Sequence, residues 1–124
     1  MTQTQTQQIT MQPLECARYA ADVASDKLAT DIVVLDISDI SDFADYFVII
    51  SVESTRQMRA LVEDLEHALE EKGGIRHHRE GAPESGWMLL DFGDVVIHVF
   101  GVEERQFYAL EAAWSEATEL VRIL

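Results

Sequence analysis

The segment of this sequence that says most about the fold runs from Trp87 to Trp114 (WMLLDFGDVVIHVFGVEERQFYALEAAW). Two apolar runs of β-favouring residues, Trp87–Phe92 and Val95–Phe100, are separated only by Gly93 and Asp94. A two-residue connection with glycine at its first central position is typical of a β-hairpin. Apolar residues then recur at helical spacing, as Phe107, Leu110, Trp114 and Ala117. The segment therefore predicts an antiparallel strand pair that is followed directly by an amphipathic helix.

Helical and strand patterns alternate upstream of this segment. Pro13 suits the first position of a helix that has small apolar residues on one face and ends near Ala29. The runs Ile32–Ile37 and Tyr46–Ser51 are almost continuously apolar, as in strands buried on both faces, and an acidic connector, residues 38–45, joins them. This alternation, together with one antiparallel hairpin, predicts an α/β fold with a small mixed sheet flanked by helices.

A further helix is marked at both ends. Residues 54–57 (STRQ) match a capping box, and the glycine pair at 73–74 supplies a C-terminal stop. We predict a short strand at residues 75–79 and a polar turn at residues 80–86. The last eight residues, 117–124 (ATELVRIL), continue a helical periodicity.

The composition indicates one globular domain. The 124 residues are 48% hydrophobic and 26% charged, which is ordinary for such a protein. The first twelve residues, rich in glutamine and threonine, predict a disordered polar tail before a domain over residues 13–124. Cys16 is the only cysteine, which fits a reducing compartment. No run approaches the roughly 18 apolar residues of a membrane helix and no targeting pattern is evident, so we expect a cytoplasmic protein without a membrane segment.

The net charge of the chain indicates what kind of partner it can bind. The chain has 23 acidic and 9 basic residues, for a formal net charge of −14. Binding to nucleic acid draws much of its affinity from lysine and arginine side chains that neutralise phosphates. We therefore expect little direct contact with RNA, and we expect a basic protein surface as the partner of an acidic docking face.

Catalytic and metal-binding patterns are weak. Four aspartates recur every third residue from Asp36 to Asp45, but the glycine and distal glutamate of a calcium loop are missing. The four histidines do not fall at zinc-ligand spacings, and His98, within a strand, is more consistent with a packed or surface imidazole than with a catalytic base. Phosphate-binding and dinucleotide fingerprints are absent. We predict no catalytic residue, no metal and no cofactor.

Large aromatic residues gather in the last third of the chain. Most are expected in the core, to which we assign Phe100, Phe107 and Trp114. Tryptophan and tyrosine are also frequent interface anchors, and an acidic rim around them would suit a basic partner. Trp87 begins a strand at the edge of an element, so we predict that it anchors an interface.

Four sequence pieces, taken together, resemble one known family. They are DYFVI at 45–49, the segment Ser51–Gln57, W-x-L-L-D-x-G-D-V-V-x-H-x-F at 87–100 and R-x-F-Y-x-L-E-x-x-W at 105–114. In this order they resemble the ribosomal silencing factor family, also called Iojap-like proteins, over roughly Leu14 to Trp114. The resemblance implies a small nucleotidyltransferase-like fold.

The resemblance also implies a function without catalysis. Such factors repress translation: they bind the large ribosomal subunit through large-subunit ribosomal protein fourteen and sterically block joining of the small subunit. They also affect maturation of the large subunit. Carried over to this chain, the implied contact residues are Trp87, Met88, Leu89, Asp91, Asp94, Tyr108 and Glu111.

Two alternatives stay open at this point. The rival class is an enzyme, either a nucleotidyltransferase with displaced catalytic carboxylates or a hydrolase without a known motif. An active nucleotidyltransferase needs a Gly-Ser turn against phosphate and paired carboxylates for two metals, and residues 51–54 (SVES) contain no glycine. The extension after Trp114 lies outside the family pattern, and packing on the domain, formation of a homodimer or covering of a surface are all open for it.

Overall fold

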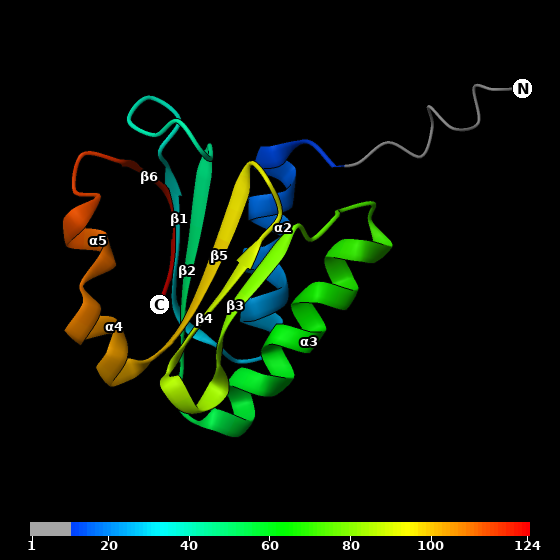
Figure 1. Ribbon diagram of the computed structural model, residues 1–124, viewed down its shortest axis with the longest axis vertical. Coiled ribbons are helices and arrows are strands. Elements are labelled where there is room, and N and C mark those ends of the chain that lie inside the picture. Colours follow the sequence, from blue (N-terminus) through cyan, green and yellow to red (C-terminus); the bar gives the residue numbers. More distant parts are fainter. Residues whose placement is uncertain (1–10) are drawn as a thin grey trace, which may run out of the picture.

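A single six-stranded sheet runs through the computed structural model, which describes residues 11–124 (Figure 1). Its strand order is β3-β4-β5-β2-β1-β6. The parallel pair is β2 with β5, and the other neighbours are antiparallel, so the sheet is mixed as predicted. The predicted polar tail lies largely outside the described residues. The strands are β1 Thr30–Asp36, β2 Tyr46–Val52, β3 His78–Ala82, β4 Trp87–Asp91, β5 Val95–Gly101 and β6 Thr118–Ile123.

Two long helices cover one face of this sheet. They are α2 (Pro13–Asp26) and α3 (Thr55–Glu71), which lie side by side in Figure 1. The buried face of α2 consists of alanines and Cys16, so this helix approaches the strands closely, whereas α3 contributes a stripe of larger side chains. Together with the facing strand residues they form the larger of the two cores.

The predicted ends of α3 are confirmed. The Ser54 hydroxyl accepts a hydrogen bond from the Gln57 amide at 3.0 Å, and the Gln57 side chain accepts one from the Glu53 amide at 2.8 Å. The first bond satisfies a donor that the helix leaves free at its start, and the second fixes the chain just before the cap. At the other end Gly73 has a φ of 93°, and the Gly74 amide donates to the Leu69 carbonyl at 2.8 Å, which ends the helix.

The hairpin is also confirmed. The Phe92 amide donates to the Val95 carbonyl at 2.8 Å, and Gly93 has a φ of 86°, which glycine adopts without strain. The Asp91 carboxylate accepts a hydrogen bond from the Gly93 amide at 2.7 Å and so stabilises the turn.

The opposite face of the sheet is covered by shorter helices than the face beneath α2 and α3. Two short helices lie there, α4 (Val102–Tyr108) and α5 (Leu110–Ala113), at the left in Figure 1. The smaller core beneath them is built from alternate residues of the central strands, with Trp87, Leu89 and Trp114 packed at its margin. All residues of β3 are exposed, and Trp87, Leu89 and Asp91 of β4 are only partly buried, so this side of the face stays accessible.

The structure corrects four sequence predictions, of which the first three concern residues 75–114. The prediction of a single amphipathic helix after the hairpin is wrong. Ala109 adopts a left-handed conformation (φ 48°), which separates α4 from α5. Phe107 is therefore not a core residue, since its side chain is 80% exposed. The predicted strand at 75–79 begins only at His78 and continues to Ala82, into the predicted turn, whose remainder is the short 3₁₀ helix Pro83–Ser85.

The last residues do not form a helix. They form β6, which pairs antiparallel with β1 at the edge of the sheet. Val121 and Ile123 are partly buried against the larger core, at the two-residue spacing of a strand. Over so short a segment the same spacing of apolar residues fits a helix or a strand. The strand forms because it pairs with the edge of β1 that no other strand occupies. The extension after Trp114 thus packs on the domain.

Candidate functional site

The partly covered face of the sheet contains an aromatic groove. It has a volume of about 380 Å³ and lies between α5, the connector before β2 and strands β3 to β5. Its apolar walls are mainly Phe43, Phe47, Trp87, Leu89 and Trp114. Carboxylates of Glu80 and Asp91 and the imidazoles of His78 and His98 complete its lining.

A second hollow lies on the other side of Trp87. It has a volume of about 290 Å³ and is lined by Glu80, Gly81, Ser85, Trp87, Leu89 and Tyr108. Trp87, Leu89 and Glu80 line both hollows, so they form a ridge between the groove and α4. Adjacent apolar hollows separated by an aromatic side chain are a common form of protein-binding surface.

Trp87 is half-buried and tightly placed. Its ring stacks on Phe100 at a centroid distance of 4.9 Å and packs on Tyr108 at 4.6 Å. The indole Nε1–H donates a hydrogen bond to Nδ1 of His98 at 3.2 Å. Burial lowers the pKa of His98 to about 3, so this imidazole is neutral at physiological pH and its Nδ1 lone pair is free to accept.

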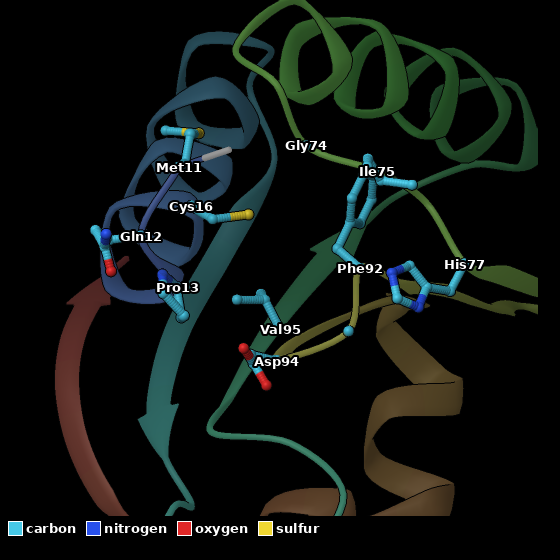
Figure 2. A pocket seen from close by; sticks show the side chains of 11 residues that line it. Met11, Gln12, Pro13, Cys16, Gly74, Ile75, His77, Phe92, Asp94 and Val95 are labelled. Carbon is cyan, nitrogen blue, oxygen red and sulfur yellow. The ribbon is translucent and has the colours of Figure 1, made fainter. Parts of the chain in front are cut away.

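The predicted contact residues on the hairpin do not all share one face. Trp87, Leu89 and Asp91 line the groove, because alternate residues of a strand point to the same side. Met88 points to the other side, is 1% exposed and belongs to the larger core beneath α2 and α3. Its side chain is therefore not available to a partner. Asp94 is exposed in the turn and lines a different hollow, beside the start of α2 (Figure 2).

The two predicted contact residues after the hairpin have different environments. Tyr108 is 46% exposed on α4, next to Trp87. Glu111 on α5 accepts hydrogen bonds from Arg105 at 3.0 Å and from Arg122 at 3.3 Å. Desolvation raises the pKa of Glu111, but the hydrogen bonds and charges of these two arginines outweigh it and the net shift is downward. Glu111 thus stabilises the arrangement of the C-terminal elements.

Sequence reasoning missed three surface residues at this face. Phe107 is the most exposed aromatic side chain of the described residues, at 80%, and packs edge-on against Tyr108 at 5.1 Å. Phe43 is 62% exposed at the margin of the groove, and Glu80 lines both hollows from β3. An aromatic residue within an acidic connector was a usable signal for Phe43. Phe107 has helical spacing and gave no such signal, because the break at Ala109 changes its direction.

The hollow shown in Figure 2 does not have the chemistry of a nucleophile site. It has a volume of about 380 Å³ and lies between the start of α2, the turn of the hairpin and the chain before β3. Cys16 and His77 both line it. Burial raises the pKa of the Cys16 thiol to about 11, which leaves almost no thiolate at neutral pH, and the thiolate is the reactive form.

A fourth region lies where the parallel strands β2 and β5 end and helices α3 and α4 begin. In open α/β sheets this end of the strands is the usual ligand site. Here a hollow of about 450 Å³ is lined by four carboxylates, those of Glu53, Glu84, Glu103 and Glu104. The Glu104 side chain also occupies the space above Gly86 and Gly101, where a ligand would approach the backbone. A phosphate group at this position would meet these like charges, of which that of Glu84 is paired with Arg59 at 2.9 Å.

Two further findings concern metal ions and membranes. Within residues 11–124 no three side chains of the histidine, cysteine or carboxylate type are grouped so that they could bind a metal ion. Among the helices that the structure describes, none has the length and apolar character needed to cross a lipid bilayer.

The fold and the face together define an α/β domain with an aromatic, acid-rimmed surface on one side of its sheet. Comparison of the sequence with known protein families identifies the family of this domain. Residues 10–123 match the family described as "Ribosomal silencing factor during starvation", and the chain belongs to this family. The family assignment made from the four sequence pieces is thereby confirmed.

Individual relatives agree with this assignment. The chain is similar to the ribosomal silencing factor RsfS of Bacillus subtilis, with 41% identity over 100 residues, which cover 81% of this chain and 85% of that protein. It is 36% identical over 91 residues to the mouse protein named mitochondrial assembly of ribosomal large subunit protein 1, covering 70% of this chain and 40% of that protein. A crystal structure of a Chromobacterium violaceum protein matches with a TM-score of 0.81 and 31% identity, covering 85% of this chain and 88% of that chain. The predicted α/β class with a mixed sheet and flanking helices is confirmed.

Proposed function

We propose that this protein represses translation by binding the large ribosomal subunit in the cytoplasm and sterically blocking the small subunit from joining it. Family membership and the names of its relatives, which refer to silencing of ribosomes and to assembly of their large subunit, support this proposal. A domain that occupies a contact surface needs no chemistry, so the proposed role is not enzymatic. We further propose that binding affects maturation of the large subunit.

The observation that carries the proposal is the aromatic ridge and groove around Trp87 on a strongly acidic chain. Half-buried aromatic residues next to shallow hollows are typical anchors of protein interfaces. Among the described residues the carboxylate of Asp91, at the rim, forms no ion pair, and that of Glu80 pairs only with the imidazole of His78, at 2.8 Å. Carboxylates that have no lysine or arginine partner, placed around an apolar centre, favour a basic partner.

We propose that this partner is large-subunit ribosomal protein fourteen, contacted with little direct participation of RNA. A net charge of −14 opposes binding to a phosphate backbone and favours a basic protein. The proposed contacts centre on Trp87, Leu89 and Tyr108, with Asp91 at the rim and Asp94 further out. We add Glu80, which lines both hollows, and Phe107, whose exposed ring packs against Tyr108. Met88 and Glu111 act through the fold and not through direct contact.

Sedimentation tests the proposal most directly. Tagged protein should migrate with free large subunits in a sucrose gradient and not with small subunits or translating ribosomes. The variant Glu80→Lys should weaken this association, because it places a cation against a basic partner. Glu63→Lys makes the same change of charge on the outer surface of α3 and serves as the matched control. Stable migration with small subunits alone, or equal behaviour of both variants, would contradict the proposal.

The salt dependence of association tests the charge argument separately. The Debye length falls from roughly 30 Å at 0.01 M to about 8 Å at 0.15 M ionic strength, so attraction between separated charges weakens. The association rate constant with large subunits should therefore fall over this range, while Glu80→Lys should show a smaller slope. An association rate that is independent of salt would mean that the acidic residues contribute solubility and not steering.

The enzymatic alternative makes a different prediction. A nucleotidyltransferase should bind nucleotide in the presence of Mg²⁺, and isothermal titration would detect a micromolar signal. Such binding needs a cluster of magnesium ligands, and within the described residues no three carboxylate, histidine or cysteine side chains are grouped to provide one. We expect no heat of binding, and a magnesium-dependent signal would favour the enzyme.

A further inference from the structure

His98 is a buried polar residue in an otherwise apolar strand. It lies at the centre of β5 (VVIHVFG) and is 3% exposed. Its Nδ1 accepts the hydrogen bond from the Trp87 indole, so in the neutral ring the proton resides on Nε2. Within the described residues Nε2 is buried and has no hydrogen-bond partner.

Such a residue is unfavourable for the core itself. A buried donor without a partner loses its hydrogen bonds to water and gains none in return. An apolar side chain of similar size at this position would avoid that loss. The structure offers one polar interaction in exchange, and it is the acceptor that His98 provides for Trp87.

The His98 ring is itself firmly located. It packs edge-on against Phe47 at 4.6 Å and lies nearly parallel to Phe100 at 6.3 Å, with 11° between the planes. Phe100 is fully buried and also stacks on Trp87. An acceptor set in this cluster therefore occupies one place and one orientation. It can select a single position of the indole.

We propose that His98 is a positioning residue for docking: by accepting the indole N–H it fixes Trp87 in the orientation that forms the wall of the aromatic groove. This inference rests on the proposed function, since it assumes that Trp87 anchors the large subunit. A side chain that is already immobilised loses less conformational freedom on binding, so the hydrogen bond increases affinity without contacting the partner. The buried histidine therefore lowers the stability of the fold, and in return it holds the binding surface in its bound form.

Two nearly isosteric variants test this inference. His98→Asn keeps an oxygen acceptor close to the place of Nδ1, whereas His98→Leu has a similar volume and no acceptor. We compare their melting temperatures, their affinities for purified large subunits and the hydrogen exchange of the Trp87 indole N–H by NMR. The positioning role predicts that Leu has the higher melting temperature but binds about fivefold to tenfold more weakly, the value of one ordinary hydrogen bond. It also predicts that Asn retains affinity and slow indole exchange.

A purely structural role predicts the reverse order of affinities. If His98 only fills the core, affinity should follow the melting temperature, with Leu binding at least as well as Asn, and that result would overturn the inference. The variant Trp87→Phe provides a second test, because it removes the donor. In that background His98→Leu should cause no further loss of affinity, and an additional loss of fivefold or more would also overturn the inference. If the unchanged protein does not bind large subunits, the proposed function itself fails, and this outcome is distinct because it appears before any variant is made.

Discussion

Arg105 on α4 donates a hydrogen bond to the hydroxyl of Ser51 on β2 at 2.8 Å, across 54 residues of sequence. The same guanidinium donates to the carbonyl of Asp31 and to the carboxylate of Glu111. Only 7% of Arg105 is exposed. This side chain therefore connects α4 and α5 to the central strands, and it sets where Tyr108 lies relative to the hairpin.

We expect Arg105→Met to destabilise the fold by about 2–3 kcal/mol. Removing one partner of a fully buried ion pair costs roughly 3–5 kcal/mol, and the effect is smaller here because Glu111 is partly exposed and keeps Arg122. Urea denaturation measures the change. Arg59→Met removes an exposed pair with Glu84 and is the matched control, for which we expect a change below about 1 kcal/mol. Equal effects of the two substitutions would contradict the role of Arg105.

Glu111 should make stability depend on acid pH. Its pKa in the folded protein is below the ordinary value of 4.5, because hydrogen bonds from Arg105 and Arg122 outweigh desolvation. A lowered folded-state pKa means that the stabilisation is complete above the ordinary pKa and is lost as pH falls through the lowered one. The difference in unfolding free energy between the unchanged protein and Glu111→Gln should therefore be largest at neutral pH and shrink as the pH falls below the ordinary pKa of 4.5. A difference that grows on acidification would contradict this assignment.

Substitutions of Trp87 and Phe107 should differ in their effect on stability, although both should weaken binding. Trp87→Ala removes stacking on Phe100 and a hydrogen bond, so we expect a loss of about 2 kcal/mol of stability, less than the 3–5 kcal/mol of a fully buried aromatic residue, together with weaker binding. Phe107→Ala removes an exposed ring and should leave the melting temperature nearly unchanged while weakening binding. Melting and affinity are measured for both. Normal binding by Phe107→Ala would exclude the exposed side of α4 from the interface.

Removal of β6 should expose an edge strand. A chain that ends after Ala117 loses the pairing with β1 and the contacts of Arg122 with Asp31 and Glu111. The buried strand β1 then presents unpaired backbone groups, which promote association between copies. We expect a lower melting temperature and concentration-dependent oligomers in sedimentation velocity experiments. A monomer of unchanged stability would show that β6 contributes little to the fold.

Local features were well predicted by the sequence alone. The cap at Ser54, the turn at Gly93 and the apolar stripe of α3 depend on residues that are close together in the chain, so their spacing is sufficient to identify them. Four such pieces in order also identified the family, and the excess of carboxylates defined the expected partner as basic. For the same reason the central strands were recognised from continuous apolar runs.

Only the tertiary structure decided the rest, because it depends on contacts between distant residues. The free edge of β1 makes a strand of residues 118–123, and the break at Ala109 turns Phe107 out to solvent. The pleat of β4 separates Met88 from Trp87 and Leu89, although all three are adjacent in the sequence. The pairing of Trp87 with His98 joins neighbouring strands across the hairpin. None of these contacts has a local signal, since each is fixed by which elements pack together and not by the residues beside it.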